Sequence, residues 1–202
     1  MVIIGLTGGS GVGKGCVCRE FLKYNINSID TDQTARQVCD KGKPCLNELV
    51  TYFGNVILND DGTLNRKQLA SIAFADKDKH AFLNKTTHYY ILNEARAWLN
   101  TQRAEGHIAA IVDAPLLFES SFDKECDVII SVTAPREKRI ERLLIRDNIP
   151  LEAIELRLSK QWNDEFYTEK SNFVIQNNGS LEEVAEQVKK IYNQLFSSSN
   201  ME

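Results

Sequence analysis

Residues 8–15, Gly8-Gly9-Ser10-Gly11-Val12-Gly13-Lys14-Gly15, decide the fold of this chain. They match the spacing G-x-x-x-x-G-K, and they follow a continuous apolar run, 2–7, that predicts a buried strand. A helical pattern, 14–24, begins at the lysine. Glycines let backbone N–H groups turn inward around an anion, and a helix N-terminus directs its positive dipole end to the same place. The alternative is an ordinary glycine-rich turn, which the strand, the spacing and the lysine together argue against.

The loop therefore predicts a site for the phosphates of ATP. Lys14 adds a mobile positive charge near the β- and γ-phosphates. The predicted binding residues are Gly9, Ser10, Gly11, Val12, Gly13, Lys14, Gly15 and Cys16. The motif normally ends in Ser or Thr, whose hydroxyl holds Mg²⁺, but here the position is Gly15. Three interpretations stay open: water takes the coordination place, the metal binds weakly, or the chain is a damaged kinase.

The rest of the chain alternates short apolar runs with longer helical patterns. Apolar runs at 26–30, 107–112, 127–133 and 173–176 predict further strands, and helical patterns include 34–39, 135–146 and 180–195. Continuously apolar strands separated by helices indicate an α/β fold with a parallel sheet covered on both faces. Residues 1–34, 107–135 and 171–196 would form this core. Residues 35–106 read as a helical insertion, 136–170 as a mobile cover, and 197–202 as a disordered tail.

Composition limits the possible partners of the protein. The net charge of -4 and the pI near 5.5 argue against nucleic acid. No apolar run approaches the ~20 residues needed to cross a membrane, and the start does not resemble a signal peptide, so we expect a cytoplasmic protein. The five cysteines are odd in number and scattered, which favours buried thiols over disulfides. Cys16 and Cys18 lack a second ligand pair, so zinc is not expected.

Three aspartates follow predicted strands. Asp30 and Asp32 end the run 26–30, and open α/β sheets place ligands at the carboxyl ends of their strands. Asp32 could accept a proton from an attacking hydroxyl, or it could cap the next helix. Asp30 could orient water around a metal. Asp113 ends four apolar residues, as in a Walker B motif that holds Mg²⁺, or it is a strand-end carboxylate in the turn before Pro115.

Arginines recur at helical spacing in the predicted cover. Arg139, Arg142 and Arg146 would form one basic face, which could stabilise charge on a moving phosphoryl group or could be solvated surface. The same segment contains three aromatic residues. They could stack on adenine, but we expect them to pack within the cover. These residues are Trp162, Phe166 and Tyr167.

An ordered set of motifs resembles the dephospho-CoA kinase family over nearly the whole chain. It includes GLTGGSGVGKG, IDTD, ARQV, APLLFE, Gln161 and FVI before NNG. The resemblance implies a P-loop NTPase three-layer sandwich with a parallel five-stranded sheet, a helical substrate-binding domain and a lid. It implies transfer of the ATP γ-phosphate to the ribose 3′-hydroxyl of dephospho-CoA, with Mg²⁺, in a protein that we expect to be a monomer. It makes Asp32 the base, and Arg142 and Arg146 lid residues.

Two other functions stay open at this point. A kinase for another nucleoside or nucleotide would share the core motifs and differ in the helical insertion. A non-catalytic ATP-binding module is also possible because of Gly15.

Overall fold

The computed structural model describes residues 1–196, so the tail predicted to be disordered, 197–202, lies outside the described residues. The elements follow in the order β1 (Val2–Thr7), α1 (Lys14–Leu22), β2 (Asn27–Asp30), α2 (Thr31–Gln37), α3 (Pro44–Phe53), η1 (Asn55–Ile57), α4 (Arg66–Phe74), α5 (Lys77–Ala104), β3 (Ala109–Asp113), η2 (Phe122–Glu125), β4 (Val128–Thr133), α6 (Arg136–Asp147), α7 (Leu151–Ser159), α8 (Asp164–Glu169), β5 (Phe173–Gln176) and α9 (Leu181–Phe196).

The five strands form one sheet in the order β2-β3-β1-β4-β5. β1 pairs in parallel with β3 and with β4, and β4 pairs in parallel with β5. The register places Leu6 of β1 opposite Asp113 of β3. The predicted parallel sheet of an α/β fold is therefore confirmed. Its central strand leads directly into the glycine-rich loop, so that loop lies at the carboxyl edge of the sheet.

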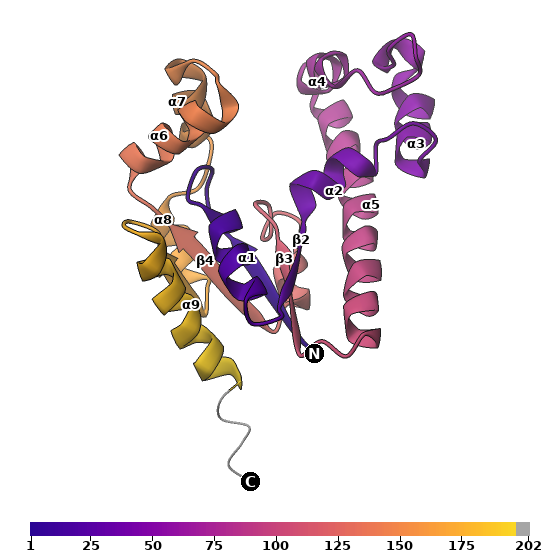
Figure 1. Cartoon of the computed structure of the whole chain (residues 1–202). Helices are drawn as coiled ribbons and strands as arrows, with labels where there is room; N and C mark the ends of the chain where they lie inside the picture. Colours follow the sequence, from indigo (N-terminus) through magenta and orange to yellow (C-terminus); the bar gives the residue numbers. More distant parts are fainter. Residues whose placement is uncertain (197–202) are drawn as a thin grey trace. The chain divides into compact units, whose positions relative to one another are not determined.

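Helices α1 and α9 cover one face of the sheet (Figure 1). The apolar residues of α9 recur at i, i+4 and i+7, so they line one side of the helix. They are Val184, Val188 and Ile191, which are buried together with Phe21 of α1 and Ile4 of β1. Burial of such a shared apolar cluster is the main stabilising contribution to this layer.

Gly5 faces the opposite side of the sheet, because its strand neighbours Ile4 and Leu6 point toward α1 and α9. A Cβ at Gly5 would lie 2.8 Å from the Sγ of Cys126 and 2.9 Å from a methyl group of Leu117. Side chains from the segment between β3 and β4 therefore lie directly on the strand backbone. With α1 and α9 opposite, they complete the three-layer arrangement.

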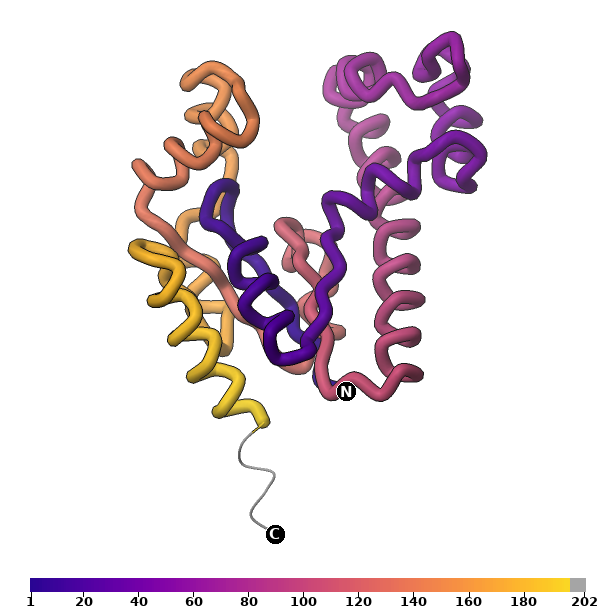
Figure 2. Tube along the Cα trace, viewed as in Figure 1, coloured from indigo at the N-terminus to yellow at the C-terminus, as the bar shows by residue number. Residues whose placement is uncertain are grey.

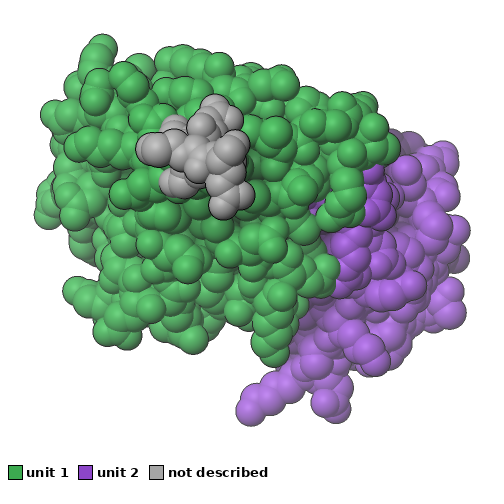
Figure 3. Space-filling model, turned by 90° about the horizontal axis from the view of Figure 1, so that it is seen from below, with its two compact units in different colours: residues 1–29, 101–202 green, residues 30–100 purple. Residues whose placement is uncertain are grey.

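The chain divides into two compact units (Figure 3). The first combines Met1–Ile29 with Thr101–Glu202, and the second is the continuous segment Asp30–Asn100. The sequence predicts this helical insertion at 35–106. The helix predicted at 34–39 instead begins at Thr31, because Asp30 caps it directly after β2. Figure 2 follows the chain from β2 into this helical unit and back through α5.

The helical unit has an apolar core of its own. Its buried members are Val38, Cys39, Cys45, Leu49, Ile57 and Leu69. A turn at 59–62 is closed by the N–H of Gly62, which donates to the carbonyl of Asn59 at 2.9 Å. Arg66, at the start of α4, donates to the carbonyl of Arg36 at 3.0 Å. This bond joins α4 to α2 within the unit.

The segment predicted as a cover contains α6, α7 and α8. Pro135 lies just before α6 and not inside it, so its fixed φ sets the entry into the helix. Asn163 caps α8 by accepting a hydrogen bond from the N–H of Phe166 at 3.1 Å. Within the part of the chain that the structure describes, no helix combines the length and the apolar character needed to cross a membrane.

Candidate active site

The glycine-rich loop takes a shape that two of its glycines make possible. Gly8 has φ 136° and Gly13 has φ 94°, in the region that L side chains rarely adopt. A Cβ at Gly8 would lie 2.4 Å from the carbonyl oxygen of Val132, and one at Gly13 would lie 2.1 Å from Nδ2 of Asn177. The loop therefore packs tightly against the ends of β4 and β5, and any other residue at these positions would displace the backbone.

Lys14 and Asp113 lie side by side at the start of α1. The Nζ of Lys14 is 4.0 Å from Oδ1 of Asp113 and donates to the carbonyl of Gly8 at 3.2 Å. Both side chains are 13% exposed. The pairing of β1 with β3 brings Asp113 here, since it lies opposite Leu6 in the register. The sheet thus joins the two residues that the sequence assigned to phosphate and metal.

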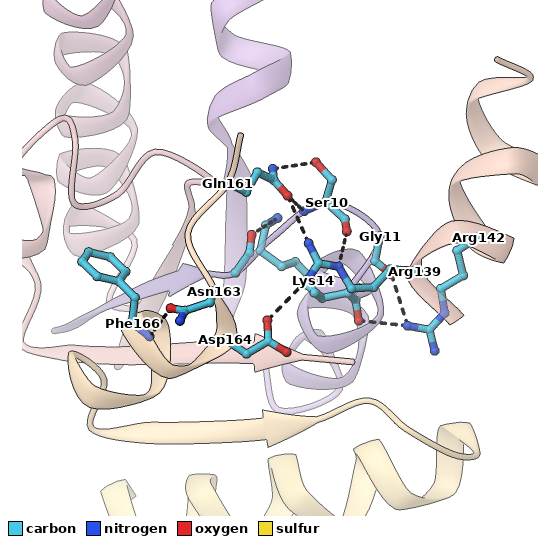
Figure 4. Close-up of polar contacts among 11 residues, drawn as sticks. Ser10, Gly11, Lys14, Arg139, Arg142, Gln161, Asn163, Asp164 and Phe166 are labelled. Atoms are coloured by element: carbon cyan, nitrogen blue, oxygen red, sulfur yellow. Dashed lines mark hydrogen bonds and ion pairs between the residues drawn. The ribbon is translucent and has the colours of Figure 1, made fainter. Parts of the chain in front are cut away.

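Arg139 and Gln161 contact the N–H, the carbonyl and the hydroxyl of Ser10 (Figure 4). We call these two residues the Ser10 clamp. Oε1 of Gln161 accepts from the N–H of Ser10 at 2.9 Å, and Nε2 of Gln161 donates to Oγ of Ser10 at 2.9 Å. Nε of Arg139 donates to the carbonyl of Ser10 at 2.9 Å. Both clamp residues belong to the segment predicted as a cover, so this segment directly fixes the conformation of the loop.

Arg139 is itself fixed by two further contacts. Its Nη2 donates to Oε1 of Gln161 at 3.1 Å, and its Nη1 lies 3.4 Å from Oδ1 of Asp164. The side chain is almost fully buried. Partial burial raises the pKa of Asp164, and the neighbouring guanidinium opposes this rise. The ion pair therefore anchors Arg139 within the fold.

Arg142 lies against the other half of the loop. Its Nη1 donates to the carbonyls of Gly11 at 3.2 Å and Val12 at 3.1 Å (Figure 4). Its Nη2 donates to the backbone carbonyl and to Oδ1 of Asn177, both at 3.1 Å. Nδ2 of Asn177 in turn donates to the carbonyl of Val12 at 2.8 Å. Arg142 and Asn177 thus hold the carbonyl groups of Gly11 and Val12 in place.

Arg146 is placed differently from Arg142. Its side chain is 64% exposed, and its Nε donates to Oδ1 of Asp147 at 2.6 Å. Arg157 of α7 also donates to Asp147, at 2.5 Å. The hydrogen bonds from Arg146 and then Arg157 lower the pKa of Asp147 to about 2. This exposed network connects α6 to α7. Among the predicted arginines, the structure brings Arg139 and Arg142 to the loop, and Arg146 donates to Asp147.

Asp30 and Asp32 open the helical unit. Oδ1 of Asp30 accepts from the N–H groups of Asp32 at 2.8 Å and Gln33 at 3.2 Å, so Asp30 is the N-cap of α2. The alternative interpretation of Asp32 as this cap is therefore wrong. Asp32 lies in the first turn of α2 and is exposed. Its carboxylate is not used for the cap, so a role in proton transfer stays available to it.

Gly15 and Cys16 occupy the first turn of α1. Gly15 is exposed, and a Cβ there would meet only Nη1 of Arg19, at 3.9 Å. The thiol of Cys16 is buried in the core next to α9, while its N–H donates to the carbonyl of Gly13 at 2.9 Å. Cys16 therefore has a packed side chain, and Gly15 leaves open space where the motif normally has a hydroxyl.

The site has one carboxylate that suits Mg²⁺, namely Asp113, a hard oxygen ligand beside Lys14. Among residues 1–196, no group of three or more His, Cys, Asp or Glu side chains could hold a metal ion by itself. Mg²⁺ readily keeps waters and phosphate oxygens as ligands, so a single carboxylate is compatible with it. The donor set thus fits a metal that arrives together with a nucleotide.

The three aromatic residues of the cover form a cluster with Phe118. Tyr167 is buried, and the ring centroids of Trp162 and Phe166 are 3.7 Å apart. The expected packing role is confirmed for Tyr167 and Phe166. Trp162 packs and also lines a cavity of about 660 Å³, which the ends of β4 and β5 border.

The sequence did not predict that three residues contact the loop and fix its shape: Arg139, Gln161 and Asn177. A signal existed for each of them. Arg139 belonged to the basic helical face, and the other two lay within the motifs of the family resemblance. The sequence did not show that these residues lie near the loop in space, since Ser10 and Gln161 are 151 positions apart in the chain.

Comparisons with known proteins agree with this geometry. A relative described as dephospho-CoA kinase from Listeria innocua is 40% identical over 189 residues, which cover 92% of each chain. One of the same description from Corynebacterium glutamicum is 34% identical over 200 residues, 99% of this chain and 100% of the relative. The crystal structure of TT1252 from Thermus thermophilus superposes with a TM-score of 0.83 at 25% identity, over 96% of this chain and 97% of that one. A family model described as dephospho-CoA kinase matches residues 2–183, and this chain therefore belongs to the dephospho-CoA kinase family.

Proposed function

We propose that this protein transfers the γ-phosphate of ATP to the ribose 3′-hydroxyl of dephospho-CoA, giving coenzyme A and ADP. The observation that carries this proposal is the pairing of Lys14 with Asp113 at the end of a clamped glycine-rich loop, in a member of this family. Phosphoryl transfer requires mainly positioning and charge stabilisation, and such a loop provides both.

The loop and Lys14 bind the phosphates. Backbone N–H groups of the loop and of the first turn of α1 would donate to the phosphate oxygens, apart from those of Ser10 and Cys16, which donate to Gln161 and to the carbonyl of Gly13. The ammonium group of Lys14 would lie near the β- and γ-phosphates, where negative charge is greatest. Asp113, together with phosphate oxygens and water, would hold Mg²⁺, which neutralises phosphate charge when bound.

Asp32 is our candidate for the group that receives the proton. In the proposed step the ribose 3′-oxygen attacks the γ-phosphorus, and the bond from that phosphorus to the bridging oxygen of ADP breaks. The hydroxyl proton passes to the carboxylate of Asp32 and then to solvent. The position of Asp32 directly after β2 supports this role, because ligands of open α/β sheets bind at the carboxyl ends of strands.

The segment 136–170 would serve as the lid, and residues 35–106 as the domain for dephospho-CoA. Arg142 and Arg146 are the candidates for stabilising charge on the moving phosphoryl group. The Ser10 clamp supports the lid assignment, because it already joins this segment to the phosphate loop. A closed lid would exclude water that could otherwise accept the phosphate. We expect a cytoplasmic protein that acts as a monomer.

The deciding experiment is a measurement of ADP release with and without dephospho-CoA, over a range of Mg²⁺ concentrations. We expect ADP release to require both. Faster turnover with nucleoside monophosphates than with dephospho-CoA would identify a different kinase. Binding of ATP without acceptor-dependent ADP release would identify a non-catalytic module.

A further inference from the structure

Two cysteines of the helical unit lie in contact although the proposed reaction does not use them. Cys39 follows the end of α2, and Cys45 is in the first turn of α3. Their Sγ atoms are 3.7 Å apart. Both residues are buried, with 3% and 0% of their surface exposed. Both are free thiols in the structure.

The surroundings give the two sulfurs different roles. The pKa of Cys39 is lowered to about 7, first by the hydrogen bond from Cys45 and then by the guanidinium of Arg66, while burial opposes the change. The pKa of Cys45 is raised, because its proton is held in the bond to Cys39 and its site is dry. These shifts favour the thiolate at Cys39 and the protonated thiol at Cys45. A thiolate is the nucleophile in disulfide chemistry, so Cys39 is the attacking sulfur of the pair.

The backbone between the two cysteines can adjust. A disulfide needs an S–S distance of about 2.05 Å, so the sulfurs must approach each other from their present contact. Residues 40–44 are exposed, and Gly42 has φ 86° with no atom within 4 Å of the position of a Cβ. The turn residues 40–44 are not members of the apolar core, although Cys39 and Cys45 on either side of them are. A small shift at Gly42 would bring the two helix ends, and with them the sulfurs, together.

We propose that Cys39 and Cys45 form a reversible redox dithiol, a modification site that peroxides oxidise to a disulfide. The Cys39 thiolate attacks one oxygen of hydrogen peroxide, the O–O bond breaks, and hydroxide leaves with Cys39 as a sulfenic acid. The sulfur of Cys45 then attacks the Cys39 sulfur, and its proton leaves with the sulfenic oxygen as water. The two sulfurs are oxidised by two electrons and the peroxide is reduced to water.

Cys126 provides a matched comparison in the same chain. It is also poorly exposed, but burial and then the neighbouring Asp123 raise its pKa to about 12. Its Sγ contacts the carbonyl of Phe122 at 3.3 Å and has no second sulfur beside it in the described contacts. Burial thus disfavours the thiolate at Cys126. The pair Cys39 and Cys45 differs from Cys126 because it places a second sulfur beside the one whose pKa is lowered.

Peptide mapping tests the proposal directly. The folded wild-type protein is treated with hydrogen peroxide, its remaining thiols are alkylated in denaturant, and trypsin is added. Trypsin cuts after Arg36, Lys41 and Arg66 but not at Lys43, which precedes proline. The disulfide would therefore link two separate peptides, 37–41 and 42–66. We expect this linked species to form before Cys126 is oxidised and to disappear with dithiothreitol.

A variant resolves the order of the steps. Cys45→Ser keeps a hydroxyl that can donate to Cys39 but removes the resolving sulfur, so a sulfenic acid should accumulate on Cys39 and be trapped by dimedone. The proposal is overturned if Cys126 reacts as fast as the pair, or if the linked peptides form only in unfolded protein. These readouts are covalent, so they stand whether or not the proposed phosphotransfer is correct.

Discussion

Gly15 is the position at which this chain departs from its motif, and replacing it with serine is a quantitative test. It is the second residue of α1, it is exposed, and a Cβ there would have 3.9 Å to the nearest atom, Nη1 of Arg19. Its φ lies outside the left-handed region, so Gly15→Ser fits without strain. The helical propensity of serine exceeds that of glycine by about 0.5 kcal/mol in a helix interior. We expect the free energy of unfolding to rise by about 0.3–0.5 kcal/mol, or roughly 1–2 °C in Tm.

The hydroxyl should also strengthen the metal site. One added oxygen ligand in place of water should contribute about 1 kcal/mol, which lowers the Mg²⁺ concentration for half-maximal rate by about fivefold. Gly15→Ala is the matched control, because it gives the larger gain in helix stability, up to about 1 kcal/mol, without a ligand. The assay is a Mg²⁺ titration of dephospho-CoA-dependent ADP release at fixed ATP, with urea unfolding of the three proteins in parallel.

The two readouts separate the possible explanations. If serine and alanine shift the Mg²⁺ response equally, the hydroxyl is not a ligand and the reasoning about the metal is refuted. If serine destabilises the protein, the open space that the structure shows at Gly15 is misjudged. An inactive natural protein that serine restores would identify a damaged kinase.

Substitutions at five further positions test the roles assigned above. Lys14→Ala should remove most turnover with an unchanged far-UV circular dichroism spectrum, and near-normal ADP release would refute the phosphate role. Asp32→Asn should lower kcat by about 10²–10⁴ with little change in stability, because Asp30 and not Asp32 caps α2. A kcat within a few-fold of wild type would exclude Asp32 as the base. Arg142→Ala should lower the free energy of unfolding in urea by roughly 2–4 kcal/mol, because it removes several hydrogen bonds from a charged donor. Arg146→Ala, at an exposed site, should lower it by less than about 0.5 kcal/mol. Equal losses in the two variants would contradict the role of Arg142 in holding the loop. Gln161→Ala should weaken ATP binding, measured by calorimetry, about tenfold. Gln161→Glu should restore part of the affinity, because it keeps an oxygen that accepts from the N–H of Ser10. Unchanged affinity in both variants would show that the clamp does not shape the loop.

The fold could be read from the sequence because its signals are local. The run before Gly8, the loop and the following helix share one short segment, and the other strands are short apolar runs of the same kind. The start of α2 was predicted three residues late because a single side-chain contact, that of Asp30 with two N–H groups, decides it. Such a cap has no periodicity to recognise.

The candidate site was predictable only in its local part. Lys14 and Asp113 belong to separate motifs, and the strand order that joins them follows from the fold. The clamp was not predictable in this way, because Arg139 and Gln161 reach Ser10 only after α6 and the segment following α7 have packed. Helical spacing showed that the arginines share a face, but it could not show which of them meets the loop.

The division of the chain into a continuous unit and a split one has a consequence for its synthesis. Asp30–Asn100 is complete as soon as its last residue leaves the ribosome, and such a segment can fold while translation continues. β1 emerges first but must wait for both of its sheet partners, β3 and β4, to be made. The length of chain between β1 and these partners adds little to the entropic cost of bringing the strands together, because that cost grows only logarithmically with the number of residues. It does impose an order: Gln161 and Asn177 are added late, so the nascent chain carries a finished helical unit well before its glycine-rich loop can take the shape that holds a phosphate.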